Sequence, residues 1–292
     1  MGPATPARCG ARPCRSGPDR LGAPLCDALI GSTGFVGGAL LAQRRFGARF
    51  HSADIEGIAG RRFGRVVCAG VTAVKWWANA NPAADLAGIQ HLTACLDRVE
   101  ASSFVLISTV DVYANPQGVT EDDPAPAPGV YQSDAHPSGL HPYGQHRAML
   151  EDWVRTRFPR HHIVRLPALF GPGLKKNALF DLLHANRLAW IDPASRFQWY
   201  PLSRLADDID RAQAAALPLV NLVTEPLPMA AIQQRLFPGQ RLGGQTQPVA
   251  YDVRTRYGPV FGGNGDYAMT AAAVMSALAA FVAEAQAPPG KA

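Results

Sequence analysis

Residues 28–38 of this 292-residue chain read ALIGSTGFVGG, and this stretch decides the fold. An apolar run precedes three glycines spaced three residues apart, Gly31, Gly34 and Gly37, and a second apolar run, ALLA, follows at 39–42. A strand, a glycine-rich turn and a helix in this order are typical of a dinucleotide-binding site. Glycine permits the tight turn and lets the backbone approach a diphosphate, while the helix N-terminus offers free N–H groups. The cofactor-binding candidates here are Gly31, Thr33, Gly34, Phe35, Val36 and Gly37.

Two alternatives to a dinucleotide site are an ATP P-loop and a glycine-rich turn that binds no ligand. The spacing is GxxGxxG rather than GxGxxG, and no Gly-Lys-Ser/Thr follows, which excludes an ATP P-loop. A glycine-rich turn without a ligand is the plain alternative, and the strand and helix on either side argue against it.

The rest of the chain alternates short apolar runs with helical patterns, which predicts an α/β fold. Strands are expected at 25–30, 48–51, 65–70, 104–108 and 162–166, and helices follow 38, span 82–99 and begin at 142. Because the runs are apolar throughout, they predict a doubly wound parallel sheet of the Rossmann type, covered on both faces. We expect residues 25–167 to form the dinucleotide-binding domain. Residues 168–292 should form mainly a small C-terminal substrate-binding lobe, with some segments returning to the sheet domain.

Composition narrows the class of protein. The net charge of +5 is partly a tail effect, since four arginines and one aspartate lie within residues 1–24, so a nucleic-acid partner is not indicated. No apolar run reaches the roughly 20 residues that span a bilayer, so no membrane partner is expected. Residues 1–24 are rich in Pro, Gly and Arg, which predicts a disordered tail or a start site placed too early, with a transit peptide as a weaker alternative.

The five cysteines have no paired spacing, which argues against disulfides and a zinc site and fits a reducing cytoplasm. Two of them, Cys26 and Cys68, lie in apolar runs and are expected to be buried thiols. His141 and His146 lack a neighbouring carboxylate or thiolate in the sequence, so we expect no metal.

A second group of polar residues follows the strand expected at 104–108. Ser108 and Thr109 end that strand, and the carboxyl ends of parallel strands face the ligand crevice. Tyr143 and Arg147 are four residues apart on the helix expected from 142, so they share one face. A cation held near a phenol lowers a pKa that is otherwise near 10. The pattern predicts a tyrosine that exchanges a proton with a substrate.

The motifs GSTGFVG, STVDVY and YGQHR, in this order, resemble the extended short-chain dehydrogenases/reductases, the group that contains nucleotide-sugar epimerases and dehydratases. The resemblance covers residues 26–175 well and continues more loosely beyond them. It implies that Tyr143 is the catalytic tyrosine and Thr109 the catalytic Ser/Thr. It also implies that Ala69 and Gly70 pass the adenine ribose and pyrophosphate, and that Pro167 and Ala168 lie near the nicotinamide carboxamide.

The chain departs from the family at two positions. The family has YxxxK, whose lysine bonds the nicotinamide ribose and lowers the tyrosine pKa, and Arg147 stands there instead. Arginine keeps the charge but cannot relay a proton through its own nitrogen. The helix around 85–87 also lacks an asparagine that many relatives have. Two hypotheses follow: an enzyme with a modified tetrad, or a catalytically weak NAD(P)-binding sensor or scaffold. Retention of both Thr109 and Tyr143 favours the enzyme.

The choice between NAD and NADP stays open. No acidic residue stands clearly about 20 positions after the glycines, where a ribose ligand is expected. Asp54 is the nearest acid, and Ser52 or His51 occupies the diagnostic position instead. Arg44 and Arg45 end the preceding helix, from which a cation could reach a 2′-phosphate.

The expected substrate is a small molecule, by resemblance a nucleotide-activated sugar, with a smaller carbonyl compound as the alternative. Lys75 could reach a phosphate or the nicotinamide ribose. Lys175, Lys176 and Asn177 follow a GPG turn where relatives contact the substrate's diphosphate. The sequence thus predicts a cytoplasmic NAD(P)-dependent oxidoreductase or epimerase that works by hydride transfer. Relatives often pair through helices of the sheet domain, which makes a homodimer the expected assembly.

Overall fold

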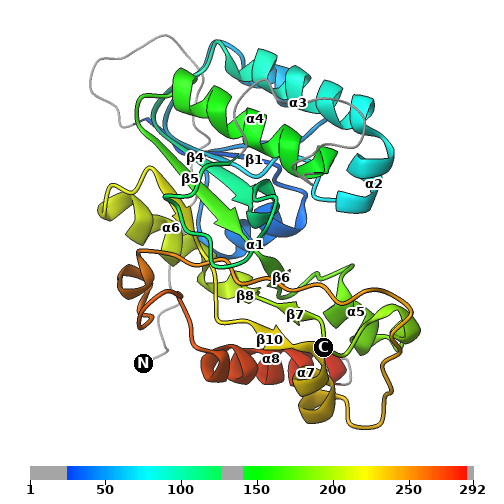
Figure 1. Cartoon of the computed structure of the whole chain (residues 1–292). Coiled ribbons are helices and arrows are strands. Elements are labelled where there is room, and N and C mark those ends of the chain that lie inside the picture. The colour runs from blue at the N-terminus through cyan, green and yellow to red at the C-terminus, as the bar shows by residue number, and fades with distance from the viewer. Residues whose placement is uncertain (1–24, 126–140, 288–292) are drawn as a thin grey trace, which may run out of the picture.

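The computed structural model describes residues 25–125 and 141–287, and Figure 1 shows them as a sheet domain joined to a smaller lobe. The predicted disordered tail at 1–24, and residues 126–140 of the polar loop after the fourth strand, lie outside the described residues.

A six-stranded sheet, parallel throughout, forms the centre of the larger part, with the strand order β2-β1-β3-β4-β5-β9. The strands are β1 (Ala28–Ile30), β2 (Ala48–Phe50), β3 (Arg62–Cys68), β4 (Glu100–Thr109), β5 (His161–Leu166) and β9 (Leu219–Asn221). The chain passes from β1 outward to β2 and then crosses to β3 on the other side of β1. Ligands of open α/β sheets bind at such a switch point, at the carboxyl ends of the strands.

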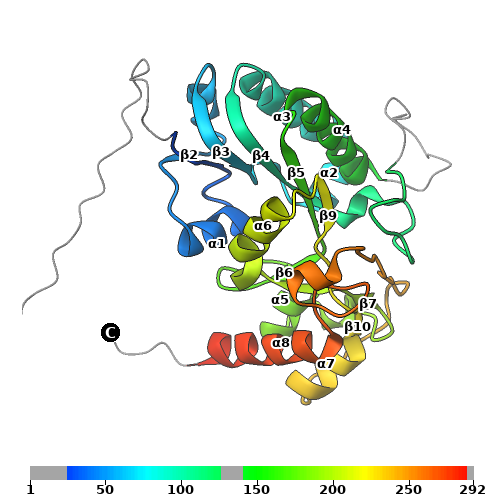
Figure 2. The same ribbon diagram turned by 90° about the vertical axis from the view of Figure 1, so that its left-hand side faces the viewer.

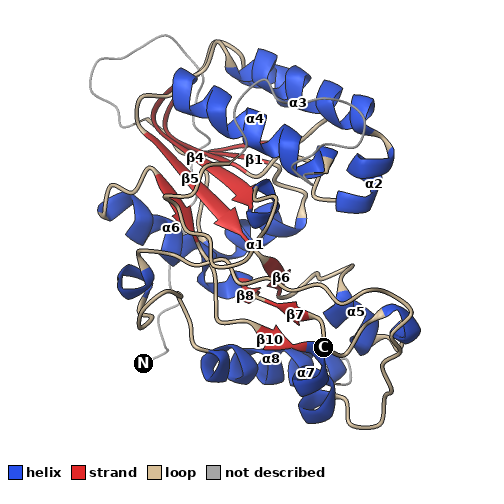
Figure 3. Cartoon of the chain, viewed as in Figure 1, coloured by secondary structure: helices blue, strands red, loops and turns tan. Residues whose placement is uncertain are grey.

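Helices cover both faces of this sheet (Figures 2 and 3). One face carries α1 (Phe35–Gln43) and α6 (Leu205–Ala214), and the other carries α3 (Pro82–Leu96) and α4 (Pro142–Arg157), with the short α2 (Lys75–Ala80) before α3. Neighbouring strand residues alternate between the two cores, so Leu29 packs with α1 and α6 while Ile30 packs with α3 and α4. Both faces of the sheet are therefore buried under helices, and the predicted doubly wound α/β fold is confirmed.

The smaller lobe is built from two short strand pairs and three helices. Its strands are β6 (Ala168–Phe170) with β8 (Trp199–Pro201), and β7 (Arg196–Phe197) with β10 (Leu227–Pro228). Its helices are α5 (Ala178–Leu183), α7 (Met229–Leu236) and α8 (Ala271–Gln286). They share one apolar core, and the chain returns from this lobe to the sheet through α6 and β9.

Short 3₁₀ turns join several of these elements. They are Ile55–Ile58, Val110–Val112, Leu188–Trp190, Leu202–Arg204 and Gly258–Phe261. No helix among the described residues is both long and apolar enough to cross a membrane.

Local backbone geometry explains where the observed elements differ from the predicted ones. The apolar pattern of residues 178–188 predicts a helix over this range, but α5 ends at Leu183, because Ala185 and Arg187 have φ angles of 49° and 48°, which a right-handed helix does not contain. The first strand begins only at Ala28, and Cys26 before it is half-buried rather than buried. Cys68, inside β3, is buried as predicted.

Candidate active site

The glycine turn lies where β1 meets β3. Gly31 has a φ of 83°, which favours glycine, and a Cβ there would overlap the carbonyl oxygen of Ala69. A Cβ on Gly37 would likewise overlap the carbonyl of Gly31. The Gly31 N–H donates to the carbonyl of Phe50 at 2.8 Å, which fixes the turn to the end of β2. The first N–H groups of α1 have no partners within the helix. This open helix end beside the glycine turn fits a diphosphate.

At the end of β2, the acidic residue Asp54 is paired with His51. Asp54 Oδ1 accepts the His51 backbone N–H at 2.6 Å, and its Oδ2 lies 3.4 Å from His51 Nε2. Ser52 is exposed beside them. Arg44, a sequence candidate for a 2′-phosphate, is held by two carboxylates of α6, those of Asp207 and Asp210.

A crevice opens at the carboxyl edge of the sheet beside the glycine turn. It is lined by Val36, Ala69, Val71, Thr72, Ala73, Ile107, Ser108, Thr109, Tyr143, Arg147, Leu166, Pro167 and Leu169. Seven sequence-predicted site residues are therefore brought together: Val36, Ala69, Ser108, Thr109, Tyr143, Arg147 and Pro167. Ala168 follows in β6, half-buried, whereas Thr33 and Ser52 are exposed outside the lining.

Tyr143 stands in the first turn of α4. Pro142 fixes the φ angle that begins this helix, and Asn79 Oδ1 accepts the Tyr143 backbone N–H at 3.0 Å. The Tyr143 side chain lines the same crevice as Thr109, and the Thr109 hydroxyl favours the phenolate form. Burial raises the pKa of Tyr143, and although Arg147 lowers it as predicted, burial outweighs that cation. The net direction therefore differs from the sequence expectation, and the phenol holds its proton.

Arg147 forms a buried ion pair with Asp85. Its Nη1 donates to Asp85 Oδ2 at 2.5 Å and its Nη2 to Asp85 Oδ1 at 2.9 Å. It also donates to the carbonyls of Thr72 and Tyr143, and its guanidinium carbon lies 4.0 Å from the centre of the Tyr143 ring. The cation thus stacks on the phenol ring and is neutralised by Asp85.

Asp85 also accepts a hydrogen bond from His146, with 2.7 Å between Oδ2 and Nδ1. Burial opposes ionisation of this carboxyl, but the hydrogen bonds and charges of Arg147 and His146 prevail and lower the pKa of Asp85. Asp85 of α3 therefore pairs with two successive residues of α4, His146 and Arg147.

Lys75 belongs to a second charged cluster, on the opposite side of Thr109. Lys75 Nζ donates to Asp111 Oδ1 at 2.8 Å, and the Tyr251 hydroxyl donates to the same oxygen at 2.8 Å. The Asp111 backbone N–H donates to Thr109 Oγ1 at 3.1 Å, and Thr109 Oγ1 lies 3.4 Å from Asp111 Oδ2. Burial raises the pKa of Tyr251 to about 12, and Asp111 adds to this shift. We name Lys75, Asp111 and Tyr251 the Asp111 cluster.

The three substrate-contact candidates after the GPG turn have different surroundings. Asn177 Oδ1 accepts the N–H groups of Leu179 and Phe180, both at 3.1 Å, so this side chain caps α5. Lys176 donates to the carbonyl of Ala73, a residue that lines the crevice. Lys175 is exposed. Asn177 Nδ2 also donates to the carbonyl of Leu169 at 2.9 Å, so both Lys176 and Asn177 contact residues of the crevice wall.

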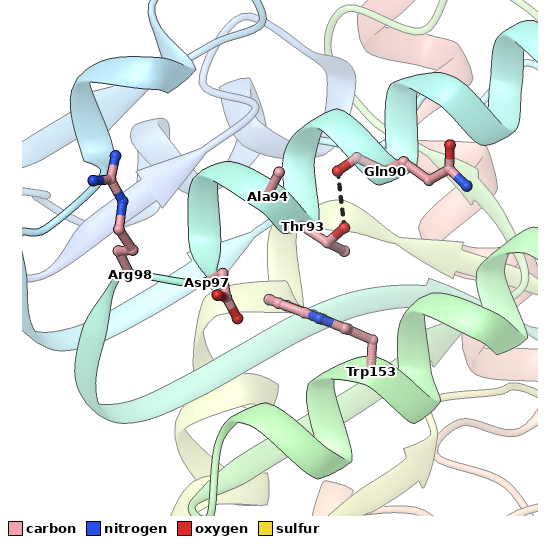
Figure 4. Close-up of a pocket in the computed structure, with 6 residues that line it drawn as sticks. All are labelled: Gln90, Thr93, Ala94, Asp97, Arg98 and Trp153. Carbon is pink, nitrogen blue, oxygen red and sulfur yellow. Dashed lines mark hydrogen bonds between the residues drawn. The ribbon is translucent and has the colours of Figure 1, made fainter.

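A second, shallow hollow lies between α3 and α4, lined by Gln90, Thr93, Ala94, Asp97, Arg98 and Trp153. Figure 4 shows the Trp153 indole reaching from α4 toward Thr93 and Asp97. The residues that α3 and the turn after it contribute end at Arg98, beside the amino end of β4, whereas Thr109 lies at the other end of this ten-residue strand, about 33 Å along it. In the described ranges, no group of three or more His, Cys, Asp or Glu side chains is placed to hold a metal ion.

Comparisons with protein-family models and with curated proteins find no match for this chain. Solved structures share its fold. A dTDP-4-dehydrorhamnose reductase from Bacillus anthracis in complex with NADP has a TM-score of 0.67 and 13% sequence identity, covering 90% of this chain and 99% of its own. MoeE5 in complex with UDP-glucuronic acid and NAD has a TM-score of 0.65, 14% identity and coverage of 88% and 99%.

A third fold relative is a UDP-N-acetylglucosamine 4-epimerase from Methanobrevibacter ruminantium, in complex with UDP-N-acetylmuramic acid. Its TM-score is 0.63 at 10% identity, with 89% of this chain and 97% of that chain covered. At these identities the likeness defines the fold, including the smaller lobe, because nearly the whole length of each relative is matched.

Sequence reasoning missed three side chains at the site: Asp85, Asp111 and Tyr251. Asp85 carries no signal in the sequence, because arginine has the same charge as lysine and its partner lies 62 residues away on another helix. Asp111 lies within the STVDVY motif, but the motif alone gives it no role. Tyr251 carries no signal either, because it contacts Asp111 from a segment 140 residues further along the chain.

Proposed function

We propose that this chain is an NAD(P)-dependent oxidoreductase or epimerase of the extended short-chain dehydrogenase/reductase type. The observation that carries the proposal is the placement of Tyr143 and Thr109 in one crevice, beside a glycine turn with no room for a Cβ. Two of the fold relatives are complexes with NAD or NADP, which supports the same proposal.

The residues fit a dinucleotide along the length of the crevice. The backbone of residues 31–37 and the open end of α1 would hold the diphosphate. Ala69 and Gly70 would lie along the adenosine side, and Pro167 and Ala168 beside the nicotinamide. When bound, the nicotinamide supplies or accepts a hydride at the substrate carbon.

Tyr143 supplies the proton chemistry of this proposal. In reduction it donates its phenolic proton to the substrate's carbonyl oxygen, and in oxidation the phenolate removes the proton from a substrate hydroxyl. Thr109 holds the same oxygen by a hydrogen bond. Arg147 packs against the Tyr143 ring, and its charge favours the phenolate. Because its N–H groups donate to Asp85 and Thr72, it acts on Tyr143 mainly through its charge.

We propose a nucleotide-activated sugar as the substrate class. Two fold relatives that match 88% and 89% of this chain are complexes with such sugar nucleotides, and Lys176 places an ammonium at the crevice wall, where a substrate diphosphate would need a cation. The proposed substrate would lie between this lobe and the carboxyl ends of β4 and β5.

Two measurements test the proposal. Fluorescence titration with NADH and NADPH should show saturable binding of at least one, and absence of both would refute the proposal. Sugar nucleotides with hydroxyl or keto groups are then screened by following reduced-coenzyme absorbance. Tyr143→Phe should lower kcat by at least about 100-fold, whereas Tyr257→Phe, a half-buried tyrosine outside the crevice, should retain activity. Coenzyme binding with no turnover of any substrate would favour a sensor or scaffold.

We also propose that the protein acts as a cytoplasmic homodimer. Cys68 and Cys95 are buried thiols, which suits a reducing compartment. The outer face of α3 exposes small residues, Ala83, Ala87 and Ala94 among them, that allow close helix approach. Light scattering should give twice the monomer mass, and Ala87→Arg should lower it. A monomer mass for the wild type at every concentration would reject the dimer.

A further inference from the structure

A buried ion pair lies behind the crevice, between α4 and β5. Glu151 of α4 and Arg165 of β5 are 0% and 1% exposed. Arg165 donates to both carboxylate oxygens, from Nε to Oε1 at 3.0 Å and from Nη2 to Oε2 at 2.6 Å, and Arg155 donates to Oε2 at 3.0 Å. A further donor comes from a residue that lines the crevice, since Ser108 Oγ donates to Oε1 at 2.6 Å. The ion pair therefore reaches the crevice through Ser108.

The surrounding contacts hold Glu151 in place. Tyr143, Arg147 and Glu151 follow one another at intervals of four residues on α4, so they lie in a row on one face of the helix. The first two line the crevice, and the third lies behind Ser108. Arg165 is fixed as well, because its Nη1 donates to the Tyr113 hydroxyl at 2.7 Å. The carboxylate is thus held by side chains that are themselves held.

The hydrogen bond to Glu151 determines what Ser108 can offer a ligand. A serine hydroxyl has one proton and two lone pairs. At 2.6 Å, the bond has the length of a charge-assisted O–H···O⁻ hydrogen bond, which is roughly twice as strong as a neutral one. An uncharged ligand group therefore does not displace the carboxylate. Ser108 presents a lone pair to the crevice, and the ligand group that meets it must donate an N–H or O–H.

We propose that Glu151 is a positioning residue, which holds Ser108 as the hydrogen-bond acceptor for the carboxamide N–H of a bound nicotinamide coenzyme. This inference rests on the proposed function and deepens it, because it gives one group of the coenzyme a partner in the protein. Glu151 does not touch the coenzyme and acts only through Ser108.

The position of Ser108 favours the coenzyme over the substrate as the donor. Ser108 lies opposite Arg165 of β5, one residue further from the carboxyl edge of β4 than Thr109. It is 9% exposed, so it belongs to the floor of the crevice. Under the proposed function the substrate lies between the smaller lobe and the strand ends, which leaves the floor to the coenzyme. The carboxamide is the group of the nicotinamide that carries N–H donors.

The test measures coenzyme binding by calorimetric titration, without substrate and without turnover. NADH is compared with its acetylpyridine analogue, in which a methyl group replaces the amide nitrogen and no N–H donor is left. If NADPH binds better than NADH, the pair that carries the 2′-phosphate is used. The measured quantity is the ratio of the two dissociation constants. A merely structural change weakens both coenzymes alike and leaves this ratio as it is.

Two variants change what Ser108 offers. Ser108→Ala removes the acceptor, and Glu151→Gln reverses its polarity. The new amide NH2 would meet one arginine N–H at the position of Oε1 but two at the position of Oε2, so it turns toward Ser108. Ser108 then accepts from this amide and turns its own proton to the crevice.

Asp208→Asn is the matched control. Asp208 is 1% exposed and also accepts from an arginine and a hydroxyl, those of Arg204 and Tyr200. It lies on α6, on the other face of the sheet, and is not among the residues that line the crevice. Loss of this carboxylate therefore disturbs a similar buried pair without touching Ser108.

We expect the preference for NADH over the analogue to fall at least about fivefold in Ser108→Ala and in Glu151→Gln. Asp208→Asn should keep the wild-type ratio. A ratio within about twofold of the wild type in either Ser108→Ala or Glu151→Gln overturns the proposal, and so does an equal change in Asp208→Asn. Absence of binding of both NADH and NADPH refutes the proposed function itself, whereas binding without the change in ratio refutes this inference alone.

A second ligand keeps the test decisive if Glu151→Gln does not fold. Nicotinic acid adenine dinucleotide carries a carboxylate in place of the carboxamide, and a Ser108 held by Glu151 has no proton to give it. The wild type should therefore bind this dinucleotide at least about fivefold less tightly than Ser108→Ala does. Equal or tighter binding by the wild type overturns the proposal.

Discussion

Replacing Asp85 by asparagine should destabilise the fold, because it leaves the Arg147 guanidinium buried without a counterion. The carboxylate accepts two hydrogen bonds from Arg147, at 2.5 and 2.9 Å, and one from His146, at 2.7 Å. Breaking one side of a buried ion pair costs about 3–5 kcal/mol. In the variant, the Thr72 and Tyr143 carbonyls still accept hydrogen bonds from Arg147, and the asparagine side chain still offers one acceptor oxygen. We therefore expect the free energy of unfolding to fall by about 3 kcal/mol, which is roughly a 150-fold larger unfolding constant.

Equilibrium unfolding in urea measures this change in the free energy of unfolding. Asp97→Asn is the matched control, because Asp97 follows the same helix but is exposed and lies 3.7 Å from its arginine, so it should change stability by less than about 1 kcal/mol. The double variant Asp85→Leu/Arg147→Met leaves neither charge of the pair without its partner. Its loss in the free energy of unfolding should therefore be smaller, by at least about 1.5 kcal/mol, than the summed losses of the two single variants. Additive effects would refute the claim that the pair is coupled.

Three further outcomes follow. Gly31→Ala should abolish coenzyme binding, because its Cβ overlaps the Ala69 carbonyl, whereas Gly38→Ala, whose Cβ meets nothing within 4 Å, should bind normally in the same titration. The fold lowers the pKa of Asp85, so its contribution is present above the unfolded value of about 3.9 and is lost as pH falls through the folded value. The stability gap between wild type and Asp85→Asn should therefore shrink from about pH 6 to about pH 2, and a constant gap would contradict the ion pair. Arg147→Lys should lower the unfolding free energy by about 1–3 kcal/mol in urea, since an ammonium cannot make both bonds to Asp85, and an unchanged midpoint would contradict this.

The sheet was predictable because its strands are apolar on both faces. Runs such as FVLIS at 104–108 have no polar alternation, and only a parallel sheet with two helical layers buries such a strand completely. The smaller lobe was less predictable. Its strands are two or three residues long, and their pairing joins segments that are distant in sequence, as Leu227 with Phe197.

The site was predictable where one local motif holds the chemistry. Gly31, Thr109 and Tyr143 each lie in a short segment whose strand or helix context determines which way it faces. The ion pair of Arg147 and the Asp111 cluster were not predictable, because their partners come from other elements. Asp85 lies 62 residues before Arg147, and Tyr251 lies 140 residues after Asp111. Such pairs depend on how α3, α4 and the smaller lobe pack, which periodicity does not determine.

A crystal structure with bound NADH or NADPH tests the central claim most directly. The account predicts the diphosphate on the backbone of residues 31–37 and the nicotinamide against Pro167. It also predicts the Tyr143 hydroxyl on the substrate side of the ring, within about 4 Å of the carbon that carries the hydride. A coenzyme bound elsewhere, or a Tyr143 hydroxyl turned away from the nicotinamide, would contradict it.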